Sequence, residues 1–127
     1  MSDQNKKTGG YIGVDLDGTL AHYDKWVSVY FIGPPIIPMV NRVKEWLRKG
    51  KRVKIFTARV SRKYHEDPNM RTEGEVAEQV IKNWCLQHVG EELEVTCIKD
   101  FDMYEYWDDR AVQVKVNTGE PLEEKRK

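Results

Sequence analysis

The chain contains little cysteine and little histidine: among its 127 residues there are two cysteines, Cys85 and Cys97, and three histidines. The cysteines form no CxxC pair, and no Cys/His cluster of the kind that binds zinc is present. Two isolated cysteines are typical of reduced thiols in a cytoplasmic protein. We therefore expect neither a disulfide framework nor a zinc centre.

Long apolar runs and an excess of one charge are also missing. No segment approaches the roughly 20 apolar residues that span a bilayer, and residues 1–8 lack the apolar stretch of a secretory signal. Lys plus Arg and Asp plus Glu number 21 each, so the formal net charge is zero. Proteins that coat nucleic acids or bind membrane surfaces normally carry a basic excess. We expect a cytoplasmic protein with no membrane partner, although a local basic patch beside a site remains compatible with this balance.

The residues that are present can build one domain with a real core. Hydrophobic residues make up 39% of the chain, with four Trp, six Tyr and three Phe. A domain of this length buries roughly two-thirds of the surface of its unfolded chain. Residues 1–10 end in two glycines and predict a flexible leader, residues 11–116 predict the domain, and residues 117–127 predict a charged tail.

Short apolar runs alternate with segments of helical period. The runs predict strands at 11–15, 53–56, 94–98 and 104–107, with a possible fifth at 112–116. One amphipathic helix is predicted between Pro38 and Gly50. A second is predicted to begin at a capping box formed by Thr72 and Glu75 and to end at Gly90. Strands that alternate with helices predict an α/β fold with a mainly parallel sheet.

The segment 21–38 is rich in aromatic residues and proline and has no clear helical period. We expect a short hairpin or flap that is closed by a rigid turn at Gly33-Pro34-Pro35. Its aromatic residues can serve simple packing, or they can form a small lid over a site.

The sharpest local motif is Asp15-Leu16-Asp17-Gly18-Thr19, which follows the first predicted strand. Ligands of parallel α/β sheets bind beyond the carboxyl ends of the strands. One carboxylate can attack phosphorus as a nucleophile, and the second, when protonated, can donate to the leaving oxygen. Taken alone, the motif is also compatible with a calcium-binding loop.

Together with three later motifs, this pattern resembles the haloacid-dehalogenase-like (HAD) superfamily of phosphohydrolases. The later motifs are the strand ending Ile55-Phe56-Thr57-Ala58-Arg59, then Lys99, then Trp107-Asp108-Asp109-Arg110. They stand in the order of the family, and the resemblance covers about residues 11–116. It implies a three-layer Rossmann-like domain, here without a large cap domain, and a magnesium-dependent phosphatase.

The resemblance also implies a role for each motif residue. Asp15 would be the nucleophile and a Mg²⁺ ligand, and Asp17 the general acid/base, whose backbone carbonyl also reaches the metal. The phosphoryl group would be held by Thr57, the backbone near Ala58, and Lys99, while Asp108 and Asp109 would complete the Mg²⁺ site. An all-oxygen site of this kind suits Mg²⁺, and a cation offsets the mutual repulsion of carboxylates and phosphate.

Two departures from the family pattern qualify the expectation. Lys99 lies only nine positions before Asp108, whereas a parallel crossover commonly takes a dozen or more residues. The third connection must therefore be compressed, or the strand at 94–98 is misplaced. Lys99 can equally be an exposed surface lysine, with Lys82 as a weaker substitute. The missing cap implies an open site, which favours a large or exposed phosphate, or a lid from another subunit.

We therefore expect a phosphomonoester hydrolase that forms an aspartyl-phosphate intermediate. The loop with Arg59, Arg62 and Lys63 looks similar to that of polynucleotide 3′-phosphatases, so a nucleic-acid 3′-phosphate or a nucleotide is the first substrate to test. The same three residues can instead be a solvated loop. The alternative function is a non-catalytic module that binds a metal or a partner, against which the intact Asp15 and Asp17 argue. The oligomeric state is left open.

Overall fold

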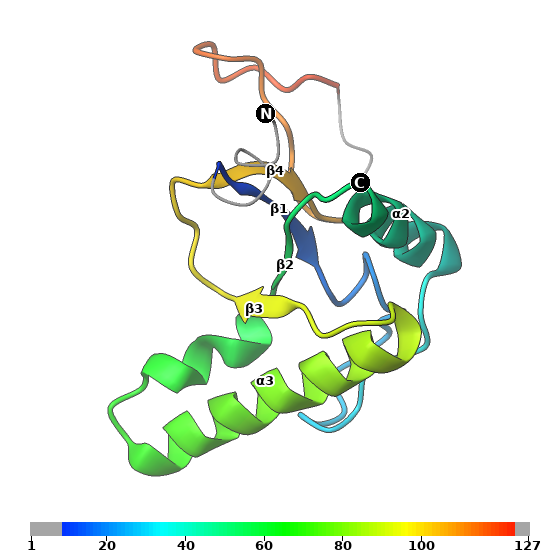
Figure 1. Cartoon of the computed structure of the whole chain (residues 1–127). Helices are drawn as coiled ribbons and strands as arrows, with labels where there is room; N and C mark the ends of the chain where they lie inside the picture. Colours follow the sequence, from blue (N-terminus) through cyan, green and yellow to red (C-terminus); the bar gives the residue numbers. More distant parts are fainter. Residues whose placement is uncertain (1–8, 124–127) are drawn as a thin grey trace.

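The computed structural model describes residues 9–123, which form a parallel sheet with helices (Figure 1). All three strand pairings are parallel, and the strand order is β3-β2-β1-β4. This arrangement confirms the predicted α/β class and parallel sheet. The elements in chain order are β1 (Tyr11–Asp15), α2 (Ile37–Arg48), β2 (Val53–Phe56), the 3₁₀-helix η1 (Ala58–Tyr64), α3 (Pro68–His88), β3 (Glu94–Thr96) and β4 (Met103–Trp107).

The core lies between the helices and one face of the sheet. On β1 and β2, the alternate residues Ile12, Val14, Val53 and Ile55 point to this face, because paired strands in register place their side chains together. They form one buried cluster with residues of both helices. The helical members of the cluster are Met39, Val40 and Val43 from α2, and Ala77, Ile81, Trp84 and Cys85 from α3.

The other face of the sheet carries aromatic side chains in place of a helix. Phe56 of β2 and Tyr106 of β4 meet edge to face, with ring centroids 5.1 Å apart. The connection 97–102 runs on the side of the sheet away from α2 (Figure 1), and the Tyr11 hydroxyl donates a hydrogen bond to Asp100. Among residues 9–123, both α-helices pack on one face, which makes two layers. The expected third layer is therefore not met, because the β3–β4 connection is too short to contain a helix.

The compressed connection between Lys99 and Asp108 is confirmed. Strand β3 ends at Thr96 and β4 begins at Met103, so the connection is short and contains no helix. It returns from one edge of the sheet to the other, which leaves β2 and β4 on opposite sides of β1. Such a reversal point in an open parallel sheet is where ligands usually bind, outside the carboxyl ends of the strands.

The boundaries of α2 agree with the sequence, whereas α3 begins earlier than predicted. Pro38 lies in the first turn of α2, and Gly50 follows it with φ of 82°. The α3 helix begins at Pro68 because Asp67 caps it, accepting a hydrogen bond from the Asn69 backbone amide at 2.9 Å. The predicted capping box at Thr72 is wrong: its hydroxyl donates instead to the Pro68 carbonyl inside the helix.

The irregular segment after β2 is the 3₁₀-helix η1, which packs against α3. The two helices approach closely at Gly74, where a Cβ would lie 2.3 Å from the Lys63 backbone nitrogen. A glycine is therefore required at this contact. Its consequence for the site is that α3 supports the segment that carries Thr57, Ala58 and Arg59.

The C-terminal segment does not extend the sheet. The predicted strand at 112–116 is wrong: Val114 instead makes an isolated antiparallel bridge with Pro121, and this segment projects from the sheet (Figure 1). Its backbone bonds are local, such as that from the Lys115 amide to the Glu120 carbonyl. Most of the predicted leader and the end of the predicted tail lie outside the described residues. No helix among residues 9–123 combines the length and apolarity needed to cross a bilayer.

Candidate active site

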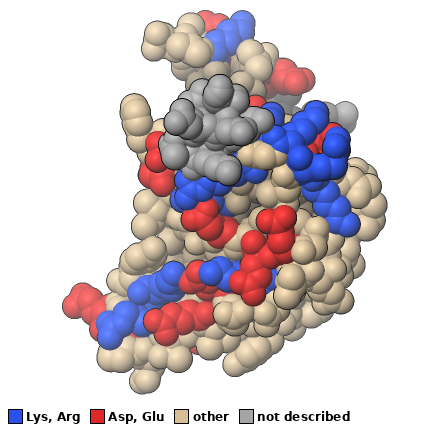
Figure 2. Space-filling model, in the orientation of Figure 1, with Lys and Arg blue, Asp and Glu red and all other residues tan. Residues whose placement is uncertain are grey.

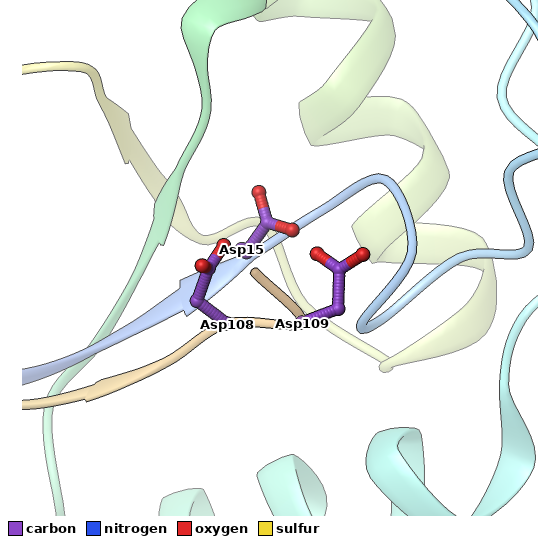
Figure 3. A group of neighbouring side chains, drawn as sticks. All are labelled: Asp15, Asp108 and Asp109. Atoms are coloured by element: carbon purple, nitrogen blue, oxygen red, sulfur yellow. The ribbon is translucent and has the colours of Figure 1, made fainter. Parts of the chain in front are cut away.

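The predicted acidic residues meet at the carboxyl ends of β1 and β4. Asp15 is the last residue of β1, and Asp108 and Asp109 directly follow β4, which pairs with β1 in parallel. Figure 3 shows the three carboxyl groups on the same side of the strand ends. One oxygen atom from each lies within 4.8 Å of the others. Carboxylates at this spacing can share one divalent cation.

The turn after β1 brings Asp109 close to the backbone. The amides of Leu20 and Ala21 both donate to the Leu16 carbonyl, which folds the chain back immediately after the strand. Gly18 in this turn has φ of 94°, and a Cβ there would lie 2.6 Å from Asp109 Oδ2. Both the conformation and the space require glycine. Gly18 of the motif thus leaves room for the carboxylate of Asp109, which follows β4.

The electrostatics of the cluster act most strongly on Asp15. Burial, a hydrogen bond with Asp109 and the charges of Asp108 and Asp109 raise the pKa of Asp15 from 3.8 to about 7. The Thr19 hydroxyl, 3.2 Å from Asp15 Oδ2, opposes this shift by donating to the carboxylate. Without a cation, these carboxyl groups stabilise a proton on Asp15. A divalent cation in the same place would relieve the repulsion.

Asp108 is held in position by its own strand end. One of its oxygens accepts the backbone amides of Arg110 and Ala111, at 3.0 and 2.8 Å, and the other accepts the Tyr106 hydroxyl at 3.1 Å. Burial and the neighbouring carboxylates raise the pKa of Tyr106, which therefore remains a donor. These hydrogen bonds fix the orientation of Asp108 toward Asp15. Sequence reasoning did not identify the contribution of Tyr106.

Thr57 stands at the end of β2, beside the cluster, and its side chain is buried. Its hydroxyl oxygen accepts the Arg59 backbone amide at 3.2 Å, which caps η1. A hydroxyl that accepts one hydrogen bond retains its own hydrogen for donation to another group. Ala58 is exposed and lines the same cavity as Asp15. Thr57 and Ala58, the predicted phosphate-binding residues that follow β2, thus lie in the same cavity as the acidic residues.

Arg59 makes a contact that the sequence did not indicate. Its Nε and Nη2 donate to the two oxygens of Asp17, at 2.7 and 2.8 Å, in a bidentate ion pair. The guanidinium also lies 4.9 Å from the ring centroid of Trp26 in the flap. The Arg59 side chain is only 6% exposed. Arg59 therefore orients the predicted acid/base and connects it to the flap.

These groups line one cavity of about 770 Å³. The segment 21–36 is a flap whose ends pair, since the His22 amide donates to Pro34 and the Ile36 amide to Leu20. Its tip forms one wall of the cavity. The flap residues of this wall are Tyr23, Trp26, Val27, Ser28, Val29 and Tyr30; the other lining residues are Asp15, Asp17, Thr57, Ala58, Arg59, Ser61, Arg62, Glu73, Asp108, Asp109 and Arg110.

Not all predicted residues join this site. Lys99 is exposed in the β3–β4 connection and is not among the residues that line the cavity, so its role stays a prediction. Arg62 lines the cavity but pairs with Glu73 of α3, and Lys63 pairs with Glu78 at 2.5 Å. Arg59, Arg62 and Lys63 are therefore all ion-paired.

Comparisons of the chain with family models, with curated proteins and with solved structures find no match. The HAD-like interpretation therefore depends on the motif residues and on their arrangement in this structure.

Proposed function

We propose that this protein is a magnesium-dependent phosphomonoester hydrolase in which Asp15 attacks phosphorus and becomes transiently phosphorylated. The observation that carries the proposal is the meeting of three carboxylates within 4.8 Å, in the same cavity as Thr57. They come from two parallel strand ends, at the place where such sheets bind ligands. The order of the motifs along the chain and the parallel strand order β3-β2-β1-β4 support the same reaction class.

The residues present fit a magnesium ion. Asp15, Asp108 and Asp109 would hold it, and the raised pKa of Asp15 is the response expected of crowded carboxyl groups without a cation. The carboxylate of Asp17 pairs with Arg59, so its predicted contribution to the metal is its backbone oxygen. When bound, Mg²⁺ supplies neutralisation of the carboxylates and polarisation of the phosphoryl group.

Asp15, Asp17 and Thr57 act in two chemical steps: transfer of the phosphoryl group to Asp15, and hydrolysis of the aspartyl phosphate. The ionised Asp15 oxygen bonds to phosphorus while the ester P–O bond breaks, and Asp17 gives a proton to the leaving oxygen. Asp17 then removes a proton from water, which attacks phosphorus and breaks the Asp15–phosphorus bond. Phosphate leaves, and both carboxyl groups return to their initial states. Thr57 donates its hydroxyl hydrogen to a phosphoryl oxygen through this sequence.

Arg59 imposes a condition on proton transfer. In the structure both oxygens of Asp17 accept hydrogen bonds from Arg59. One of these oxygens must release Arg59 and take up a proton from solvent, and it must then face the leaving-group oxygen, before Asp17 can donate that proton. Arg59 thus orients the acid/base until substrate enters the cavity.

Phosphate release from p-nitrophenyl phosphate and from a 3′-phosphorylated oligonucleotide tests the proposal. We expect release with Mg²⁺, none with EDTA, and none from Asp15→Asn. Asp17→Asn should lower kcat by about 10²- to 10⁴-fold for a substrate with a poor leaving group. Asp102→Asn, which changes an exposed carboxylate before β4, is the matched control and should be as active as the wild type. Turnover by Asp15→Asn would rule the mechanism out, and saturable metal binding without turnover would favour the non-catalytic module.

A further inference from the structure

The cavity is much larger than a phosphoryl group requires. The acidic residues and Thr57 line one part of it, and residues from the tip of the flap line another part. Two aromatic residues of this wall are strongly exposed: Trp26 by 53% and Tyr30 by 72%. Exposed aromatic rings beside a polar cavity are surfaces on which planar groups stack.

Trp26 is held in place from one side. The guanidinium of Arg59 lies over its ring, and Arg59 is fixed in turn by its two hydrogen bonds to Asp17. A ring supported in this way loses little conformational freedom when a ligand stacks on it. Trp26 of the flap is therefore connected through Arg59 to the predicted acid/base, where the leaving group of a phosphomonoester departs.

Arg59 also has an unused donor. Its Nη1 is buried and has no hydrogen-bond partner, the one such side-chain atom among residues 9–123. An unpartnered buried donor is unfavourable, and no contact of the fold explains it. Arg59 lines this cavity and also an adjoining cavity of about 410 Å³. Tyr23 and Val27 likewise line both cavities. Because Nη1 is buried, a planar leaving group reaches it only by displacing part of its cover; ring nitrogens or carbonyl oxygens can then accept this hydrogen bond, whereas a plain hydrocarbon ring cannot.

The charges of the site argue against a polynucleotide. Five acidic side chains and three arginines line the cavity, which leaves a formal charge of −2 that one divalent cation neutralises. The basic residues beside it, Arg62 and Lys63, pair with glutamates of α3. Lys and Arg side chains are intermixed with Asp and Glu on the face shown in Figure 2. A nucleic-acid backbone would need a continuous basic track.

From these observations we infer that the site takes mononucleotides, phosphomonoesters of a nucleoside whose base stacks on Trp26 and Tyr30 of the flap and accepts a hydrogen bond from Arg59. The inference rests on the proposed function for the position of the phosphoryl group. The sequence left a nucleic-acid 3′-phosphate and a nucleotide as equal candidates. The site favours the nucleotide, because it offers an aromatic wall and a hydrogen-bond donor for one base but no basic track for a polynucleotide backbone.

A kinetic comparison tests the substrate class. We measure kcat/KM with Mg²⁺ for adenosine 5′-monophosphate, glycerol phosphate and a 3′-phosphorylated oligonucleotide. The nucleotide should exceed glycerol phosphate by about tenfold or more, as stacking energies imply, and should also exceed the oligonucleotide. In Tyr30→Ala the ratio of nucleotide to glycerol phosphate should fall about tenfold, whereas Tyr30→Phe, which keeps the ring, should retain it. Phe101→Ala, which removes a fully exposed ring remote in sequence from the flap, is the control and should behave as the wild type.

A binding measurement separates failure of this inference from failure of the proposed function. Adenosine 5′-monophosphate and glycerol phosphate are titrated calorimetrically into Asp15→Asn with Mg²⁺, and then into the same variant carrying Tyr30→Ala. Tighter nucleotide binding that is lost with Tyr30 supports the inference, even where no substrate is turned over and the proposed function fails. Equal binding or turnover of the two compounds, an unchanged ratio in Tyr30→Ala, or faster turnover of the oligonucleotide would overturn it, even where the protein is a phosphatase.

Discussion

At the scale of single residues, the site is governed by the crowding of carboxyl groups around Asp15. Asp108 and Asp109 are within 4.8 Å, and Thr19 is the neighbour that donates to the Asp15 carboxylate. Burial is the largest cause of the raised Asp15 pKa, and the neighbouring charges add to it. The same features that make a metal-free Asp15 a poor nucleophile near neutral pH also make the site favourable for a cation.

The first prediction concerns the pH dependence of stability without metal. The pKa of Asp15 is about 7 in the folded protein and 3.8 ordinarily, so the folded state binds this proton more tightly. Its contribution to stability is complete below about pH 4 and is lost as the pH rises through about 7. In EDTA, the free energy of unfolding should fall from pH 5 to pH 8 by on the order of 1–3 kcal/mol more in the wild type than in Asp15→Asn.

Urea unfolding of both proteins at the two pH values measures this difference. The comparison with Asp15→Asn removes the contributions of titrating groups outside the carboxyl cluster, since those are common to both proteins. Parallel pH profiles for the two proteins would show that the carboxyl cluster does not act on Asp15 as described.

Residue types and spacing predicted part of the site. The Asp15-Leu16-Asp17-Gly18-Thr19 motif follows a buried strand, and the structure brings it next to Asp108, Asp109 and Thr57. The ion pair between Arg59 and Asp17 could not be predicted, because it joins residues 42 positions apart and depends on how two strand ends meet. For Lys99, charge and order alone indicated a role, and the structure places it in an exposed connection.

At the scale of elements, η1 and α3 together position the residues that follow β2. Capping by Thr57 begins η1, and the close contact between Gly74 and the Lys63 backbone fixes η1 against α3. Arg59, in the first turn of η1, reaches Asp17 from this supported position. A change in the packing of the two helices should therefore alter the site without touching any residue in it.

The second prediction is that Gly74→Ala destabilises the protein and impairs turnover. A Cβ at this position would lie 2.3 Å from the Lys63 nitrogen, so the helices must separate. Overpacking of this kind typically costs about 1–3 kcal/mol. Denaturant unfolding should show that loss, and kcat/KM should fall as Arg59 shifts relative to Asp17. Gln87→Ala, an exposed position of α3, is the control; equal stability of Gly74→Ala and the control would contradict the assignment.

The boundaries of the elements were predictable where a local signal exists. Pro38 and Gly50 bracket α2 because proline suits a first turn and glycine a left-handed stop. The start of α3 was missed because Thr72 and Glu75 have the pattern of a capping box, whereas Asp67 is the residue that caps the helix. The alternating valines at 112–116 have the pattern of a strand, yet their segment pairs locally through Val114 and Pro121. Periodicity does not show which partner a segment finds.

At the scale of the whole molecule, the sheet has one face covered by helices, and the short β3–β4 connection crosses the other face. The order of strands and helices predicted the parallel sheet, since each helix connects neighbouring strands. The expectation of three layers was wrong, because the number of layers depends on whether the β3–β4 connection contains a helix. The short spacing from Lys99 to Asp108 indicated that this connection has no room for a helix, and in the structure no helix lies between β3 and β4.

The third prediction is that Mg²⁺ stabilises the whole fold. An ion that binds Asp15, Asp108 and Asp109 only when β1 and β4 are paired stabilises the folded state by mass action. At a concentration 100 times Kd this amounts to about 2.7 kcal/mol. Thermal unfolding at pH 7.5 should show Tm rising with Mg²⁺ concentration in the wild type, and much less in Asp108→Asn. An equal rise of Tm in both proteins would show that Mg²⁺ binds at a different site.

The proposed covalent intermediate on Asp15 can be detected by mass spectrometry of the protein during turnover. Asp17→Asn is mixed with p-nitrophenyl phosphate and Mg²⁺ and is quenched in acid. This substrate has a good leaving group, so the first step needs little acid catalysis, whereas the second step is slowed by the loss of the base. The account predicts a mass increase of one phosphoryl group, located on the peptide with Asp15 and removed by hydroxylamine. Release of nitrophenol with no phosphorylated protein, or with the label on another residue, would contradict it.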